Sequence, residues 1–223
     1  MIAEYVTNTY EIADRYKAIR LNAKEAKVKI EPSNDDKTTL VFFEKKRWPY
    51  EFFVQDNTLT IKQKKVKWFN FSINHSQIRL CVPKAMLETI SVRLNTGHID
   101  ICAIVCDATI DIQTTTGKVD ASNISCKDFR LKANTGNANL EKLTAADSVC
   151  IENNTGNVVL NDCSAPAIFV KTNTGNVCGR LSADVVFAVN TNTGRAETPQ
   201  PTVGERIGGR CEIKTNTGNI LFE

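Results

Sequence analysis

The sequence has few of the side chains on which catalysis and metal binding most often depend. Histidine occurs only twice in 223 residues, at His75 and His98, and none of the eight cysteines forms a Cys-x-x-Cys pair. A zinc site of the usual Cys/His kind is therefore not expected. Long apolar runs are lacking as well. No stretch reaches the roughly 18 residues that a membrane-spanning helix needs, and no signal peptide is visible.

Aromatic and charged residues are unevenly distributed along the chain. Twelve of the sixteen aromatic residues lie before residue 72. Lys and Arg outnumber Asp and Glu by 16 to 11 over residues 1–90, and the balance is 12 to 14 over 91–223. The net charge of +3 is too small to indicate nucleic-acid binding. We expect an irregular β region over 1–83 that starts and caps the fold, and regular repeats over 84–223.

What the chain does contain is a repeat built on a Thr-Gly word. The word occurs seven times, Asn precedes the Thr in six of them, and the glycines are 20, 19, 20, 19, 19 and 24 residues apart. A period near 20 is typical of solenoids, in which each repeat stacks on the one before it. The seven words are Asn95-Thr96-Gly97, Thr116-Gly117, Asn134-Thr135-Gly136, Asn154-Thr155-Gly156, Asn173-Thr174-Gly175, Asn192-Thr193-Gly194 and Asn216-Thr217-Gly218.

Apolar and polar residues alternate on both sides of each glycine. Period-two alternation predicts strands that are buried on one face, and the phase shifts across the glycine, so we expect a corner there. The sequence thus predicts an all-β fold: a single-stranded parallel β-solenoid (β-helix or β-roll) of about 19–20 residues per rung, with irregular aromatic-rich N-terminal rungs. Stacked corner asparagines are expected to hydrogen-bond along the array. The column five positions before the glycine is Val92, Ile112, Leu131, Ile151, Val170, Val189 and Ile213.

Both ends of the array need protection from edge pairing. Residues 19–23 and 28–30 resemble a degenerate rung, and strands are expected at 40–43, 52–54, 59–61 and 78–82. At the other end, an insertion at 199–210 lengthens the last repeat, and the chain stops one strand after Gly218. That final strand is expected to form a poorly protected edge, which leaves end-to-end association between copies open.

Apolar residues in two outward columns mark a candidate interaction surface. Cys150, Phe169 and Ala188 stand six positions before their glycines, and Val159 and Cys178 stand three after theirs. Such residues indicate either cover by another part of the chain, such as an N-terminal element or the 198–210 loop, or contact with a partner. Cover is the simpler explanation. The sequence does not identify a surface ligand, whether protein or glycan.

Three other functions are disfavoured. Ice binding by the Thr-Asn-Thr words at 172–174, 191–193 and 215–217 needs threonines that face water, and the alternation predicts them to be buried. A calcium-binding solenoid needs Asp where these corners carry Asn. A carbohydrate-active β-helix enzyme needs several charged groups on one face, whereas only Asp100 and Asp120 stack, with His98 and Asp100 as a solvated pair. We expect no catalytic residue, no metal and no cofactor.

Two further features have plain structural interpretations. The segments 44–50 and 62–69 interleave basic and aromatic residues, which suits an anionic membrane or wall polymer but suits a protected sheet edge better. Cys106 and Cys126 both stand nine positions after a glycine, so neighbouring rungs would bring them within range of a disulfide. Most cysteines are expected to be small apolar residues of the stack.

The run from Ile78 to Pro83, the strand that leads into Asn95-Thr96-Gly97, and the repeated Thr-Gly-Asn-Val steps resemble a bacterial family of domains of unknown function described as "putative adhesins". The resemblance covers nearly the whole chain. It implies a β-solenoid in the cell envelope, often behind an N-terminal membrane segment, and it brings no catalytic residues.

From the repeats and this resemblance together we expect a non-enzymatic cell-envelope binding or scaffold module. It would be extracytoplasmic and tethered through a segment that precedes this sequence. The eight cysteines favour the alternative of a cytoplasmic location. The alternative functions are a self-assembling polymer built by stacking solenoid ends and, less favoured, the carbohydrate-active enzyme.

Overall fold

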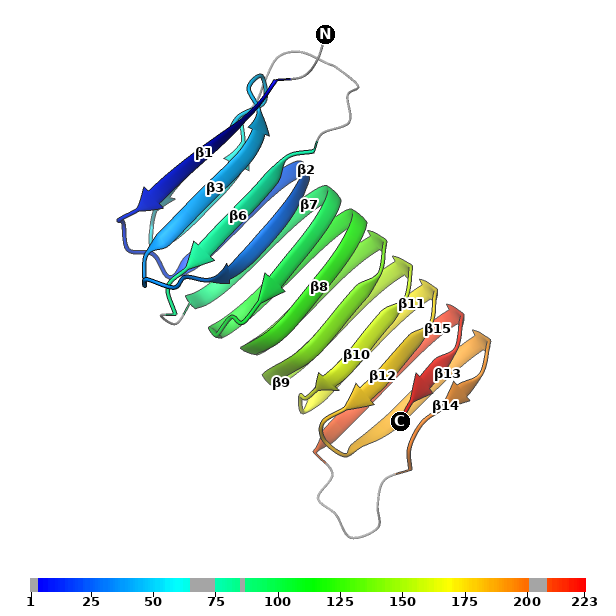
Figure 1. Ribbon diagram of the computed structural model, residues 1–223. Helices are drawn as coiled ribbons and strands as arrows, with labels where there is room; N and C mark the ends of the chain where they lie inside the picture. The colour runs from blue at the N-terminus through cyan, green and yellow to red at the C-terminus, as the bar shows by residue number, and fades with distance from the viewer. Residues whose placement is uncertain (1–3, 65–74, 85–86, 201–207) are drawn as a thin grey trace.

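The computed structural model describes residues 4–64, 75–84, 87–200 and 208–223, and all regular structure within these ranges is β. Sixteen strands form one continuous sheet that winds into a stack of rungs (Figure 1). The strands are β1 (Tyr5–Ile12), β2 (Ala18–Pro32), β3 (Thr38–Lys45), β4 (Tyr50–Gln55), β5 (Thr58–Gln63), β6 (Gln77–Val82), β7 (Leu87–Cys102), β8 (Cys106–Thr135), β9 (Ala138–Thr155), β10 (Val158–Cys163), β11 (Ala167–Thr174), β12 (Val177–Leu181), β13 (Val185–Thr193), β14 (Ala196–Glu197), β15 (Gly209–Thr217) and β16 (Ile220–Phe222).

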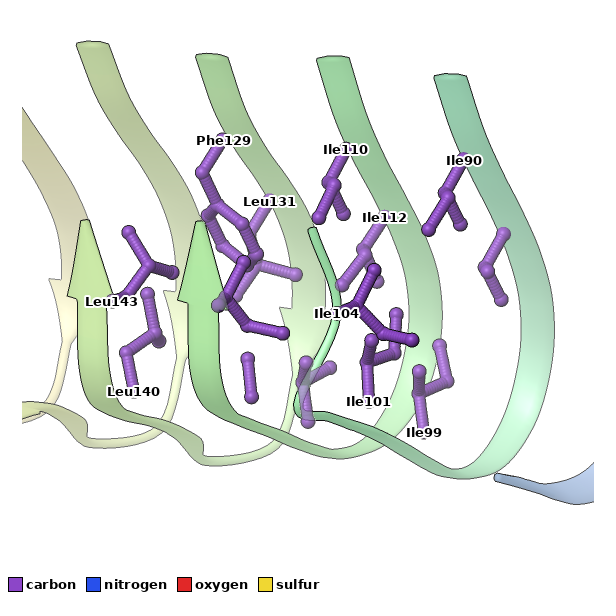
Figure 2. Packing of buried hydrophobic residues seen from close by; sticks show 14 of the residues in the cluster. Ile90, Ile99, Ile101, Ile104, Ile110, Ile112, Phe129, Leu131, Leu140 and Leu143 are labelled. Carbon is purple, nitrogen blue, oxygen red and sulfur yellow. The ribbon is translucent and has the colours of Figure 1, made fainter. Parts of the chain in front are cut away.

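Parallel pairing places equivalent residues of neighbouring rungs side by side. Leu131 pairs with Ile151, and Ile151 pairs with Val170. All three side chains are buried. Figure 2 shows the aliphatic side chains of several successive rungs projecting into one shared interior. The predicted β-solenoid, with alternate residues in a dry core, is confirmed.

The corners bring the backbones of successive rungs very close together. Gly136 has φ 143°, and a Cβ added there would lie 1.8 Å from the carbonyl oxygen of Gly117. Only glycine fits this approach.

A second bend follows six residues after four of the glycines. There Ala103, Asn123, Lys142 and Asp162 have φ between 52° and 54°. The sequence predicts a looser polar connection between rungs, for example at Glu141-Lys142 and Asn161-Asp162, and these pairs contain the bend at Lys142 and Asp162.

The N-terminal part completes one end of the stack. β2 is the predicted degenerate rung: Ile19 pairs with Ile90, and Ala26 stands opposite Gly97. On the other side of β2, β5 and β6 pair with it in parallel, and β4, β3 and β1 follow in antiparallel pairs. The Phe42 ring lies 5.3 Å from the Tyr50 ring over the end of the core. The sheet continues across the boundary expected at residue 83, and the division into two regions stays a prediction.

The C-terminal rungs are not stacked in chain order. β15 lies between β11 and β13, so that Ile213 pairs with Val170 on one side and with Val189 on the other. β16 likewise lies between β12 and β14. The rung formed by β13 and β14 is therefore the end of the array (Figure 1). The expectation that the chain's final strand forms the exposed edge is wrong.

Apolar burial explains this order. The inserted rung has Ile220 and Phe222 in its second strand, and both are buried. The end rung has an exposed Ala196 at the position of Ile220, and Thr198 and Pro199 follow. The rung with more apolar side chains gains more free energy from apolar burial when it lies between two other rungs, because both of its sides are then covered.

Candidate interaction surface

The first predicted apolar column is interrupted by the inserted strand. Cys150 and Phe169 are neighbours in β9 and β11. The next residue in the column is Glu212 of β15, and Ala188 lies beyond it. Glu212 forms ion pairs with Lys214 at 2.6 Å and Arg210 at 3.3 Å. The apolar run on this strand segment is therefore two residues long, with Phe169 42% exposed.

The second predicted column is longer than the sequence order indicates. Val159 and Cys178 are neighbours in β10 and β12, and Leu221 of β16 continues the column beyond Cys178. Leu221 is 37% exposed. Leu221 was not predicted as part of this column because a complete rung separates it from Cys178 along the chain.

The explanation by internal cover does not hold for the N-terminal strands. They lie at the opposite end of the stack from these columns (Figure 1). Residues 201–207 of the 198–210 loop lie outside the described residues. The two columns therefore remain candidates for contact with a partner.

Polar ladders run along the outside of the corners. The Asn154 amide donates to Oδ1 of Asn134 at 3.1 Å, and the amides of Asn192 and Asn216 donate in the same way to Asn216 and Asn173. On the other side of the glycines, Oδ1 of Asn157 accepts the backbone N–H of Asn176 at 2.9 Å. The predicted asparagine ladder is confirmed, and it ties successive corners together.

The Thr-Asn-Thr words do not follow the predicted alternation. Thr172 and Thr215 are buried, and the Thr215 hydroxyl donates to the Gly175 carbonyl at 3.3 Å. The second threonines, Thr174, Thr193 and Thr217, are exposed. The prediction is wrong for them because the two residues before the glycine both lie on the outside of the bend. Because Thr172 and Thr215 are buried and Thr191 is half-buried, these words do not form a face of paired exposed threonines.

A shallow groove runs along the array beside the asparagine ladder. One part, of about 530 Å³, crosses β7, β8, β9 and β11, and a second, of about 360 Å³, continues over β11, β15 and β13. The Lys132 ammonium forms an ion pair with Glu152 of the neighbouring rung at 3.2 Å. Within the described part of the chain, Arg93 and Lys171 form no ion pair, although Glu152 is the strand neighbour of Lys171. The groove is positively charged because its four basic side chains outnumber its one carboxylate, Glu152. Its outward lining is Arg93, Gln113, Lys132, Glu152, Lys171, Lys214 and Asn190 on one side, and Asn95, Thr115, Asn134, Asn154, Asn173, Asn216 and Asn192 on the other.

His98 lies against Asp120 of the next rung. Its Nε2 is 2.7 Å from Oδ2 of Asp120, Lys118 Nζ is 2.9 Å from the same oxygen, and Asn139 donates to Oδ1 at 2.8 Å. Burial acts to raise the pKa of Asp120, but the hydrogen bonds from Lys118, Asn139 and His98 outweigh it and lower that pKa. The predicted stacking of Asp100 on Asp120 is confirmed. The carboxylate bridges rungs, and no group of three metal-ligating side chains gathers anywhere in the described residues.

The eight cysteines are free thiols, and four of them belong to the core. Burial raises the pKa of Cys126 and Cys211 to about 12 and that of Cys163 to about 11. Val105 bridges to Ser125, which places Cys106 and Cys126 on neighbouring rungs. No disulfide joins them in this structure, so the expected pairing stays a prediction. These thiols act as small apolar side chains.

The first basic and aromatic segment is part of the N-terminal cap. Lys45 is buried, and its ammonium lies 4.9 Å from the Trp48 ring and 5.7 Å from the Tyr5 ring. The buried Glu44 accepts a hydrogen bond from the Asn8 amide at 2.9 Å. The favoured interpretation as a sheet edge with charged outer faces is therefore wrong for Glu44 and Lys45, which are buried in β3 between β1 and β6. Most of the second segment, over residues 65–69, lies outside the described residues.

No helix in the described residues is long and apolar enough to cross a membrane.

Comparisons with known proteins agree with this architecture. The family model described as Toastrack DUF4097 matches residues 16–194. A "putative cell adhesion protein" from Clostridium sporogenes has a similar fold, with a TM-score of 0.50, 13% identity and 99% of each chain covered. A "putative adhesin" from Parabacteroides distasonis has a TM-score of 0.53 and 16% identity over 96% of this chain and 98% of its own. Identity this low shows the fold alone. No curated protein matches the sequence.

Proposed function

We propose that the chain, which belongs to the Toastrack DUF4097 family, is a non-enzymatic binding module of the cell envelope. The adhesion names of its structural neighbours support a binding role and an extracytoplasmic location. The non-enzymatic role is further supported by the His98 cluster, whose carboxylate is occupied by hydrogen bonds between rungs. A membrane tether preceding this sequence is part of the proposal.

The groove beside the corners is the observation that carries the proposal. It is open and elongated, and it crosses successive rungs about 4.8 Å apart, so one of its walls presents an asparagine amide at a regular interval on six of seven rungs. Along the ladder, Asn216 donates to one neighbouring amide and accepts from another, Asn154 and Asn192 donate, and Asn134 and Asn173 accept. Each of these amides therefore keeps at least one N–H and one lone pair for a ligand. Such a surface suits a linear polymer rather than a compact small molecule.

The charge of the groove favours an acidic polymer. Arg93 and Lys171 lie at different rungs along the same side of the groove. Their cations would pair with carboxylate or sulfate groups of a glycan, while the amides bind its hydroxyl groups. We therefore propose an acidic glycan as the ligand class.

Charge reversal in the groove tests this function. The double variant R93E/K171E is expected to bind immobilised acidic glycans, such as polygalacturonate and heparin, at least tenfold more weakly in surface plasmon resonance. The matched control K127E/K142E makes the same change in charge at exposed positions outside the groove. It is expected to bind as the wild type does. Equal losses in the two variants would show unspecific attraction, and unchanged binding of R93E/K171E would contradict the groove as the site.

A second surface is proposed for contact with a protein. Val159, Cys178 and Leu221 form an apolar column on the other strand segment, and the exposure of Leu221 favours this role. Because this column lies outside the groove, Leu221→Asp is expected to leave glycan binding unchanged.

A further inference from the structure

The C-terminal end of the array presents an unpaired strand edge. β13 pairs with β15 on one side, and β14 pairs with β16 on one side. No other strand of the described residues pairs with either of them. The backbone groups of β13 that face away from β15 therefore have no strand partner there, which makes this edge a template for pairing with another chain.

β13 has none of the features that usually protect an edge. Its nine residues, Val-Val-Phe-Ala-Val-Asn-Thr-Asn-Thr, include no charge, no proline and no glycine. It follows the register of β15 from Val185 to Thr191 without a bulge. The strand is thus regular, uncharged and long enough to pair.

The interior of the solenoid is also incompletely covered at this edge. Phe187 and Val189 are only half-buried, whereas their neighbours in β15, Cys211 and Ile213, are fully buried. The centres of the Phe187 and Phe222 rings are 5.3 Å apart. Phe222 thus covers one side of the Phe187 ring, and the other side faces the end of the array. A strand added to β13 would extend the core over these side chains.

The opposite end of the array differs in both respects. Its edge strands, β1 and β4, carry Glu11 and Glu51, which form ion pairs with Lys37 and Lys62. Stacked aromatic rings close the core there. Head-to-tail stacking of copies would pair the uncharged β13 of one copy with a charged edge strand, β1 or β4, of the next. Nothing in the structure favours that pairing.

We propose that a second copy of this chain pairs with the free edge, β13 against β13 in antiparallel orientation, to form a tail-to-tail dimer. Two identical edges that share one interface are related by a twofold axis, which makes the paired strands antiparallel. Because β13 carries no charge, it meets its copy without like-charge repulsion. The pairing occupies the tail edge of both molecules, so assembly ends at two copies and no filament forms.

The oligomeric state of the full chain tests this proposal. Sedimentation equilibrium is expected to show a reversible change from the 24.7 kDa monomer to a species of about twice that mass as concentration rises. The variant A188K/N190K places two lysines on the outward face of β13. Antiparallel pairing would bring four lysines together, so the dimer dissociation constant is expected to rise at least tenfold. The control T7K/T9K adds the same charge at exposed positions of β1 and is expected to leave the dimer intact.

Several results would overturn the proposal. They are a monomer at every concentration up to the millimolar range, filaments, or a dimer that T7K/T9K disrupts and A188K/N190K does not. Thermal unfolding of each variant shows whether the fold is kept. If A188K/N190K does not fold, Val186→Lys, at a side chain that is already 40% exposed, replaces it and is expected to weaken the dimer in the same direction. A dimer unaffected by Val186→Lys would then count against the proposal.

Discussion

At the scale of single residues, the corner glycines are the positions where a small change has the largest consequence. Gly136→Ala would bring a Cβ to 1.8 Å from the Gly117 carbonyl oxygen, at a φ that side chains rarely adopt. We expect a loss of at least about 3 kcal/mol in the free energy of unfolding, measured by urea denaturation. The neighbouring Thr135→Ala, at an exposed side chain, is expected to change stability by no more than about 0.5 kcal/mol. Similar values for the two variants would show that the corners are not closely stacked.

The buried thiols predict how stability depends on pH. A thiol ionises near pH 9 in the unfolded chain, whereas folding raises the pKa of Cys211 to about 12. The folded state therefore keeps a proton that the unfolded state loses, so stability is fully present below pH 9 and falls as pH rises above it. Between pH 9 and 10.5 the loss is about 2 kcal/mol for one such thiol.

Comparison of Cys211→Ala with the wild type isolates this contribution. The decrease in unfolding free energy between pH 9 and 10.5 should be smaller in the variant by about that amount. Val170→Ala removes buried methyl groups but no titratable group, so it should lower stability equally at both pH values. A wild-type decrease that Cys211→Ala leaves unaltered would contradict the burial of this thiol.

Residue-scale predictions from sequence succeeded where side-chain alternation decides burial. Leu131, Ile151 and Val170 lie in one buried column because period-two alternation holds along a strand. The same rule failed for Thr174 and its equivalents, because the backbone turns there and two consecutive side chains face outward. The second bend at Lys142 lies where a polar connection is expected from the sequence, but its sharpness depends on backbone conformation at residues of no common type.

At the scale of elements, the sequence predicted the rungs but not their order. Stacking in chain order is the simplest assumption for repeats of equal length, and it holds from β7 to β11. It fails for β15, which lies between β11 and β13. A signal was present: Ile220 and Phe222 stand where the preceding repeat has Ala196 and Thr198. Reading it required comparing how much apolar surface each rung could bury.

The inserted element also changes the candidate surfaces. It separates Ala188 from Phe169 by the charged Glu212, and it adds Leu221 to Cys178. A surface that spans several rungs depends on which rungs are neighbours in space. The sequence shows which residues occupy each outward column, but it does not show which of them are neighbours in space.

At the scale of the whole molecule, stacking creates features that no single repeat contains. The groove is formed by side chains of successive rungs, and its positive charge comes from Arg93 and Lys171 on rungs that are far apart in sequence. The two ends differ because an aromatic, charged cap closes one and an uncharged strand ends the other. The proposed glycan site thus lies along the side of the array and the proposed dimer interface at its end, and the two meet at β13, whose Asn190 and Asn192 line the far part of the groove.

The order of the last rungs underlies the far part of the groove, the apolar columns and the free edge, so its measurement tests the account most directly. Lys171 and Lys214 are paired across adjacent strands, whereas Asn190 is one strand further away. Strand spacing puts the first pair about 4.8 Å apart and Lys171 and Asn190 about 10 Å apart, and a disulfide needs Cα atoms within about 7 Å. Under mild oxidation, K171C/K214C is predicted to form the cross-link and K171C/N190C is not, as identified by mass spectrometry of digested protein. A cross-link in K171C/N190C without one in K171C/K214C would show that the rungs stack in chain order and would contradict this account.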